Sequence, residues 1–338
     1  MRNLEYLKNL NSAQKEAVIS TDGPILVVAG AGSGKTKVLT SKIAHLIKNK
    51  KAFPNQILAV TFTNKAAKEM QNRVLKILKS EAVGLSWLGT FHSICAKLLR
   101  KHAKAAGLNS NFTILDTEDQ SRLIKNICKS ENIDTKKISP KIIITIIDRW
   151  KNNGWYPDSV IINKKDIYEK IILPIYKIYQ KKLIDLNACD FGDLMLHCVN
   201  ILERNKDICE IYKKNFKYIL VDEFQDISIG RANLLKALKK SNPKSTLFTV
   251  GDDWQSIYRF AGSDISVMTN YENHFGNYAL TKLDKTFRFN NQILDFSKRF
   301  IMQNPSQLDK DINSNINFLI FSSSLNLLGI AFSIIFCV

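Results

Sequence analysis

The chain has 338 residues, of which 45% are hydrophobic, so it is long enough to bury one large core or two ordinary ones. Its 49 Lys and Arg residues against 31 Asp and Glu residues give a formal net charge of +18, which attracts polyanions such as nucleic acid. A Lys-, Ile- and Asn-rich composition also follows from an A/T-rich genome, so the charge alone does not decide the partner.

The N-terminus and the cysteines both bear on the compartment. Residues 1–5 show no apolar run after a basic start, so no secretory signal is predicted. The six cysteines form no C-x-x-C pair and have no histidines at metal-ligand spacing, which indicates reduced thiols rather than a zinc site. We therefore expect a cytoplasmic protein.

Four apolar runs typical of β-strands are each followed by a helical pattern. They are 25–29, 57–61, 218–221 and 246–250. Strands that alternate with helices predict an α/β fold with a mainly parallel sheet covered on both faces. Between about 108 and 186, long Lys/Ile-rich helical patterns without a glycine-rich turn predict a helical insertion. The alternative is that this segment simply continues the same domain.

The segment AGAGSGKT directly follows the first of these strands and opens a helix. Its glycines let successive backbone N–H groups turn toward phosphates, and the helix N-terminus adds partial positive charge. We expect Lys35 to reach the β- and γ-phosphates of a nucleotide, and the hydroxyl of Thr36 to bind Mg²⁺. The predicted phosphate-binding loop consists of Ala29, where the general pattern has glycine, and Gly30, Ala31, Gly32, Ser33, Gly34, Lys35 and Thr36.

An acidic pair follows the third apolar run, at Asp222 and Glu223. Taken alone, two acids after a strand are often only the point where the strand meets solvent. Together with the loop, they predict that Asp222 binds Mg²⁺ and that Glu223 polarises the attacking water as a general base. Hydrolysis of the nucleotide, with Mg²⁺ as its metal cofactor, is therefore expected rather than mere binding.

Seven motifs in a fixed order resemble those of the UvrD/Rep-type superfamily 1 DNA helicases, and among them helicase IV most closely. The resemblance covers about residues 10–314. The motifs are LNSAQKEAV from Leu10, AGAGSGKT from Ala29, TFTNKAAKEM from Thr61, GTFHSICAKLL from Gly89, VDEFQD from Val221, VGDDWQSIYRFAGSD from Val250 and LDKTFRF from Leu283.

This resemblance implies a RecA-like P-loop NTPase domain, a parallel sheet flanked by helices, with a helical insertion and a fragment of a second RecA-like domain. ATP binds between the two RecA-like domains of such proteins. The expected divisions are 1–107 and 189–272 for the first domain (1A), 108–188 for its insertion (1B), 273–314 for the start of the second (2A), and 315–338 for an apolar tail. The match covers only an N-terminal portion of the family, so we expect impaired unwinding.

The resemblance also assigns residues to the nucleotide. It implies that Gln14 reads adenine, and that Phe287, where relatives often have tyrosine, stacks on it. It implies further that Gln255 senses the γ-phosphate and that Arg288 neutralises charge in the transition state, which completes a catalytic set with Lys35 and Glu223.

The remaining matching positions are implied to contact DNA, through aromatic rings that stack on any base and short polar groups that hold phosphates. They are Phe62, Thr63, Asn64, Thr90, Phe91, His92, Tyr258, Arg259 and Phe260. Members of this family walk along single-stranded DNA, usually 3′ to 5′, so single-stranded and tailed duplex DNA are the expected partners, in repair or recombination. The alternative is a module that binds ATP and single-stranded DNA without unwinding. The oligomeric state is not predicted.

The segment 318–338 is uncharged and apolar, and it is long enough to cross a bilayer. Three interpretations are open: a membrane anchor, a buried helix, or sequence read in a shifted frame. We prefer a shifted frame or truncation and expect no membrane contact, because three serines at 322–324 interrupt the run and its flank carries little positive charge.

Overall fold

The computed structural model describes residues 5–163, 166–304 and 307–316, and the chain divides into two compact units. Among the described residues, those within 1–88, 216–227 and 244–338 form unit 1, and those within 89–215 and 228–243 form unit 2. The segment 318–338, for which three interpretations were open, lies outside the described residues.

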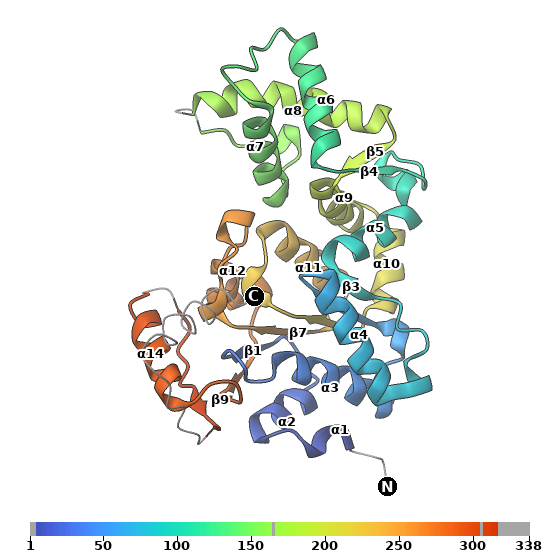
Figure 1. The fold of residues 1–338 in the computed structure, drawn as a ribbon. Coiled ribbons are helices and arrows are strands. Elements are labelled where there is room, and N and C mark those ends of the chain that lie inside the picture. Colours follow the sequence, from blue (N-terminus) through green and yellow to red (C-terminus); the bar gives the residue numbers. More distant parts are fainter. Residues whose placement is uncertain (1–4, 164–165, 305–306, 317–338) are drawn as a thin grey trace. The chain divides into compact units, whose positions relative to one another are not determined.

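A six-stranded sheet with the order β3-β2-β6-β7-β1-β8 forms the centre of unit 1 (Figure 1). Its strands are β1 (Ile25–Ala29), β2 (Ile57–Thr61), β3 (Leu88–Thr90, which ends in unit 2), β6 (Tyr218–Val221), β7 (Thr246–Gly251) and β8 (Ala279–Leu283). Strand β1 runs parallel to both of its neighbours, since Val27 pairs with Val250 of β7 and with Thr281 of β8. Strands β2, β6 and β7 are also joined in parallel. The predicted α/β fold with a parallel sheet is confirmed.

Helices cover this sheet. Unit 1 contains α1 (Glu5–Lys8), α2 (Ser12–Ile19), α3 (Lys35–Lys48), η1 (Pro54–Gln56), α4 (Asn64–Leu78) and η2 (Lys79–Ala82). Helices α2 and α3 lie together on one face of the sheet (Figure 1). Alternate strand residues such as Val27, Ala59 and Val250 join Val38 and Leu39 of α3 in one buried cluster, as the two-residue period of a strand requires.

The later part of unit 1 consists of short elements. They are η5 (Phe224–Asp226), η6 (Asp253–Gln255), η7 (Arg259–Ala261), α12 (Ser266–Thr269), α13 (Tyr271–Phe275), β9 (Lys285–Thr286), α14 (Asn291–Ile301) and β10 (Asn313–Ser314). Strands β9 and β10 pair in parallel.

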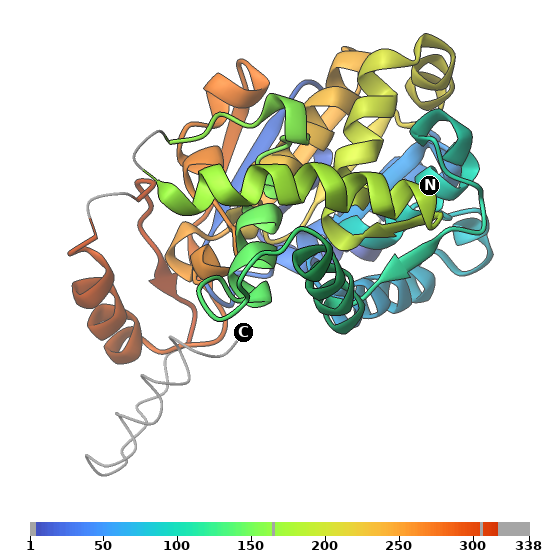
Figure 2. The ribbon, with the colours of Figure 1, turned by 90° about the horizontal axis from the view of Figure 1, so that it is seen from above.

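Unit 2 is mainly helical. Its helices are α5 (Phe91–Lys101), η3 (Ala103–Ala106), α6 (Thr117–Ser130), α7 (Pro140–Asn152), η4 (Pro157–Ser159), α8 (Ile167–Asp185), α9 (Phe191–Arg204), α10 (Lys206–Asn215) and α11 (Ile229–Ser241). Strands β4 (Thr113–Leu115) and β5 (Ala188–Asp190) form a parallel pair. Helices α6, α7 and the long α8 (Figure 2) share a buried cluster around Trp150 and Tyr176.

Unit 2 extends on both sides of the insertion expected at 108–188. The division into 1A, 1B and 2A rests on family resemblance rather than on compactness, and it stays a prediction. Among the described residues, no helix combines the length and apolarity that crossing a membrane needs.

Candidate functional site

The loop between β1 and α3 has the backbone needed to surround a phosphate group. Gly32 and Gly34 have φ values of 75° and 86°, in the left-handed region that favours glycine. Gly34 is the N-cap of α3 and provides no side-chain cap, so the first N–H groups of the helix remain available to an anion. The buried hydroxyl of Ser33 also has no hydrogen-bond partner in the described protein. These groups fit an anionic nucleotide phosphate.

Lys35 brings positive charge to this loop and is itself buried. Its Nζ lies 3.2 Å from Oε2 of Glu223 and donates a hydrogen bond of 2.8 Å to Oε1 of Gln255. Burial opposes the charged form, but the carboxylates of Asp252, Glu223 and Asp222 outweigh burial and raise the pKa of Lys35. The lysine is therefore fully charged at neutral pH. Thr36, in the first turn of α3, is partly exposed.

The predicted acidic pair lies where β6 ends. Asp222 is 4% exposed, and burial followed by the charge of Glu223 raises its pKa. Burial also acts on Glu223, but Lys35 outweighs it and lowers the pKa of Glu223. Glu223 has a φ of 48°, an uncommon value for glutamate, and its carboxylate accepts a hydrogen bond of 2.9 Å from Nε2 of Gln225. A buried carboxylate beside an ionised one suits a divalent cation, so the chemistry of Asp222 fits a Mg²⁺ ligand, and the Mg²⁺ site shared with Thr36 stays a prediction.

Gln14 lies against the phosphate-binding loop rather than free in a pocket. It is 1% exposed, its Oε1 accepts from N of Asn11 at 3.0 Å, and its Nε2 donates to O of Ser33 at 2.8 Å. These bonds hold the N-terminal end of α2 to the loop. Adenine readout by this amide stays a prediction.

The segment around β9 lies directly over the same loop. Oγ1 of Thr286 donates to O of Ala31 at 2.7 Å, and N of Phe287 donates to O of Gly32 at 3.1 Å. Phe287 keeps 46% of its surface exposed, and the charge of Arg288 contributes to the lowered pKa of Glu223. Phe287 and Arg288, predicted from resemblance, are thus brought to the loop.

A second set of contacts, at the end of β7 and beside the phosphate-binding loop, was not predicted from the sequence. Lys310 forms ion pairs with the buried Asp252 and with Asp253, the latter at 2.6 Å, and its Nζ lies 4.5 Å from the ring centroid of Trp254. A side-chain methyl of Ile312 fills the space beside Gly30, where an added Cβ would come within 2.0 Å of it. The only signal in the sequence is the pair of acids after β7, which requires some cation when buried.

The predicted DNA residues of unit 1 include a row of aromatic rings. The centroids of Phe62 and Tyr258 are 5.1 Å apart, and those of Tyr258 and Phe260 are 6.0 Å apart. Phe260 is 86% exposed, and Arg259 is also exposed. Thr63 is the N-cap of α4, and the exposed Asn64 begins that helix. This row can offer stacking surfaces to unpaired bases.

The predicted DNA residues of unit 2 lie at the start of α5. Thr90 is its N-cap, and Phe91 is buried with the guanidinium of Arg231 5.9 Å from its ring centroid. Phe91 therefore has a packing role, and contact with DNA stays a prediction for it. Burial, followed by Arg231, lowers the pKa of His92 to about 4, so this imidazole is neutral at physiological pH.

Phe191 is a further exposed ring that sequence reasoning missed. It is 48% exposed, and its ring lies edge-on to that of His92 with centroids 5.5 Å apart. No motif marks this phenylalanine, because its neighbours in sequence are Asp190, the N-cap of α9, and Gly192 rather than other aromatic residues.

A glycine loop between a strand and a helix, with a lysine facing acids at the ends of parallel strands, defines a P-loop nucleotide-binding protein. Comparison with known proteins places the chain more closely. It belongs to the UvrD/Rep helicase family, because the family described as "UvrD/REP helicase N-terminal domain" matches residues 10–276.

Three relatives illustrate this membership. The chain is 40% identical over 306 residues to the ATP-dependent DNA helicase PcrA of Staphylococcus epidermidis, covering 90% of this chain and 42% of that protein. It is 40% identical over 308 residues to PcrA of Bacillus subtilis, covering 91% and 41%. It is 40% identical over 319 residues to DNA helicase II of Rickettsia typhi, covering 92% and 47%. The chain thus spans less than half the length of these relatives. The finer resemblance to helicase IV stays a prediction.

Proposed function

We propose that this chain is the N-terminal motor portion of an ATP-dependent DNA helicase that binds single-stranded and tailed duplex DNA, moves 3′ to 5′ and acts in repair or recombination in the cytoplasm. The observation that carries the proposal is the meeting of Lys35, Glu223 and Gln255 within hydrogen-bonding distance at the phosphate-binding loop. Three motifs far apart in the sequence converge there, as nucleotide hydrolysis requires.

In this mechanism the protein positions ATP and moves one proton. Backbone N–H groups from Gly30 to Thr36 hold the phosphates, and Lys35 compensates their charge. Glu223 accepts a proton from water as the water oxygen attacks the γ-phosphorus, and the bond to the β–γ bridging oxygen breaks to release ADP and phosphate. Thr36 and Asp222 would hold Mg²⁺, which neutralises charge on the phosphate oxygens when bound. Arg288, which follows β9, neutralises the negative charge on the phosphate oxygens in the transition state.

Gln255 connects hydrolysis to DNA. Its amide contacts Lys35, and three residues further along the chain lies Tyr258, the centre of the aromatic row. An uncharged amide can change partners when the γ-phosphate leaves, which would shift the row against the bases. Phe62, Tyr258, Phe260 and, in unit 2, Phe191 are the proposed base contacts. The division into 1A, 1B and 2A given by the resemblance is kept as part of this proposal.

DNA-stimulated phosphate release by wild type and Glu223→Gln tests this function. We expect stimulation by single-stranded DNA in wild type and a loss of about 10²- to 10⁴-fold in the variant, the usual contribution of a general base. An unchanged rate in the variant would remove Glu223 from the mechanism.

A second candidate is a module that binds ATP and single-stranded DNA without unwinding. The relatives are named as ATP-dependent DNA helicases, which favours the motor over this module. A strand-separation assay on a 3′-tailed duplex distinguishes the two. Separation eliminates the module, and nucleotide binding without separation eliminates unwinding by this chain.

A further inference from the structure

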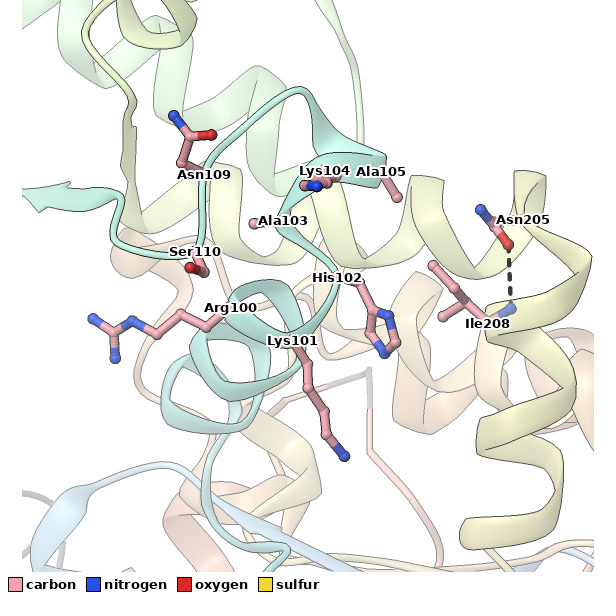
Figure 3. A pocket seen from close by; sticks show the side chains of 10 residues that line it. All are labelled: Arg100, Lys101, His102, Ala103, Lys104, Ala105, Asn109, Ser110, Asn205 and Ile208. Carbon is pink, nitrogen blue, oxygen red and sulfur yellow. Dashed lines mark hydrogen bonds between the residues drawn. The ribbon is translucent and has the colours of Figure 1, made fainter.

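Unit 2 contains an open groove at the C-terminal end of α5 that the proposed motor does not use (Figure 3). Its volume is about 630 Å³, and it lies between the end of α5, η3, the loop before β4 and the junction of α9 with α10. The polar side chains that matter for its chemistry are Arg100, Lys101, Lys104, Asn109, Ser110 and Asn205.

The charge of this groove is positive. Arg100, Lys101 and Lys104 are all exposed, and the described residues that line the groove include no Asp or Glu. In Figure 3, Arg100 and Lys101 diverge from the end of α5, and Lys104 lies beside Ala105 on η3. Three cations around one groove, with no carboxylate among its described lining residues, give the groove a positive potential that attracts an anionic ligand.

The floor of the groove is held in place by the protein. Nε2 of His102 lies 3.0 Å from the hydroxyl of the buried Tyr212, and Oδ1 of Asn205 accepts from N of Ile208 at 3.2 Å. Burial, followed by Lys101, lowers the pKa of His102, so the imidazole adds no charge at neutral pH. The positive charge therefore belongs to the three long side chains, which can adapt to a ligand above a fixed floor.

We propose that this groove binds the phosphodiester backbone of DNA without reading its sequence. Arg and Lys together with amide and hydroxyl groups are the side chains that contact phosphates and sugars in nucleic-acid complexes. Apart from His102, no aromatic ring is among the described lining residues, so the groove lacks a platform for stacking bases. Its three cations are spread and exposed, which suits a row of phosphates rather than one small anion.

The proposal rests on the proposed function, because it takes DNA as the partner of this chain. It adds a contact at the opposite end of α5 from Thr90, Phe91 and His92. A helix of 11 residues separates the two by about 15 Å at 1.5 Å per residue. DNA that touched both would be held on unit 2 at two points.

The test compares two triple variants of the full chain, Arg100→Ala/Lys101→Ala/Lys104→Ala and the charge-matched Lys8→Ala/Lys76→Ala/Lys244→Ala, whose lysines are exposed in unit 1. Fluorescence anisotropy with labelled single-stranded and duplex DNA gives the affinity at several salt concentrations. For the groove variant we expect the slope of log K, the DNA association constant, against log salt to become smaller in magnitude by about 3, one unit for each phosphate contact. The change should be the same for every DNA sequence. The control should keep the wild-type slope. The single variant Lys104→Glu repeats the test at an exposed side chain, in case the triple variant fails to fold.

Equal slopes for the two triple variants would overturn the proposal, because bulk charge would then explain all binding. A second outcome would also overturn it, in favour of a small-anion site. In that outcome, inorganic phosphate shifts the NMR signals of the groove residues, but the groove variant binds DNA with the wild-type affinity. DNA-stimulated phosphate release is measured on the same samples. If DNA does not stimulate phosphate release by wild type, but the salt slopes of the two triple variants still differ, the proposed motor is rejected and the proposed DNA contact at the groove is kept.

Discussion

Lys35 donates a hydrogen bond of 2.8 Å to Gln255, although 220 positions separate the two residues. The contact follows from strand order. Lys35 comes after β1, Gln255 after β7 and Glu223 after β6, and these three strands are adjacent and parallel. The carboxyl ends of adjacent parallel strands meet at one edge of the sheet, where α/β proteins bind their ligands.

Gly32→Ala tests the contact between the phosphate-binding loop and the β9 segment. An added Cβ would lie 2.4 Å from Cβ of Arg288 and 2.8 Å from Oγ1 of Thr286, at a φ of 75°. We expect phosphate release to fall by about tenfold or more. Displacement of Arg288 that removes about 1.4 kcal/mol of transition-state stabilisation is enough to slow the reaction tenfold.

The matched control is Gly23→Ala, at a φ of 71° with nothing within 4 Å of the added Cβ. Both variants should lose about 1 to 2 kcal/mol of stability from backbone strain, but only Gly32→Ala should lose activity. Equal activities for the two variants would remove the β9 segment from the site.

Phe260→Ala tests the aromatic row. The ring is 86% exposed, so its removal should leave the melting temperature unchanged and weaken single-stranded DNA binding by about 1 to 3 kcal/mol. Phe53→Ala is the control, because Phe53 is 72% exposed and lies outside every motif. The same loss of affinity in both variants, measured by anisotropy, would argue against a specific platform at Phe260.

The buried His45 should make the free energy of unfolding depend on pH. Its Nδ1 lies 3.1 Å from the hydroxyl of Tyr6, and burial, followed by Lys42 and Lys51, lowers its pKa to about 4. An unfolded histidine has a pKa near 6.5, so the unfolded chain takes up a proton between pH 6.5 and 4 that the folded chain refuses. The free energy of unfolding should therefore fall as the pH falls through this window.

The size of this effect should be about 1 to 3 kcal/mol for His45. Urea unfolding of wild type and His45→Gln at pH 7.5 and pH 4.5 measures it. At pH 7.5 the variant loses only its contacts, and at pH 4.5 it should have regained much of the difference. A gap between the two proteins that stays constant with pH would contradict the assignment.

Lys151→Met tests how much a buried ion pair contributes to the stability of unit 2. Its side chain is fully buried, with Nζ 2.6 Å from Asp190 and 2.8 Å from Asp193, both also buried. Lys151→Met leaves two carboxylates without their cation and should cost about 3 to 5 kcal/mol of unfolding free energy. The control Lys177→Met breaks an exposed ion pair with Asp158 and should cost less than about 1 kcal/mol. Chemical denaturation of both variants checks the difference, and equal costs would contradict it.

The parts predicted from the sequence are those set by local pattern. The strand at 25–29 and the glycines up to Gly34 were recognisable because an apolar run, a turn and a helix start are encoded in adjacent residues. The parallel sheet followed from the alternation of such runs with helices. Family resemblance then supplied Gln255 and Arg288, which no local pattern marks.

The parts not predicted depend on tertiary packing. Lys310 lies against Asp252, but nothing in the sequence distinguishes it from 48 other cations that could serve, because ion-pair partners are chosen by the fold. Phe62 and Phe91 occupy similar motifs, yet only the fold makes Phe62 partly exposed and Phe91 buried. Phe191 likewise became visible only as an exposed ring beside His92.

Equilibrium binding of a fluorescent ATP analogue in the presence of Mg²⁺ shows whether Lys35 holds the nucleotide phosphates. Wild type, Lys35→Met and the exposed neighbour Lys37→Met are compared, and circular dichroism is recorded to establish folding. We predict that wild type and Lys37→Met bind the analogue alike and that Lys35→Met, while folded, has lost the interaction with the phosphates and binds it far more weakly. Binding by folded Lys35→Met at the wild-type affinity would contradict the account.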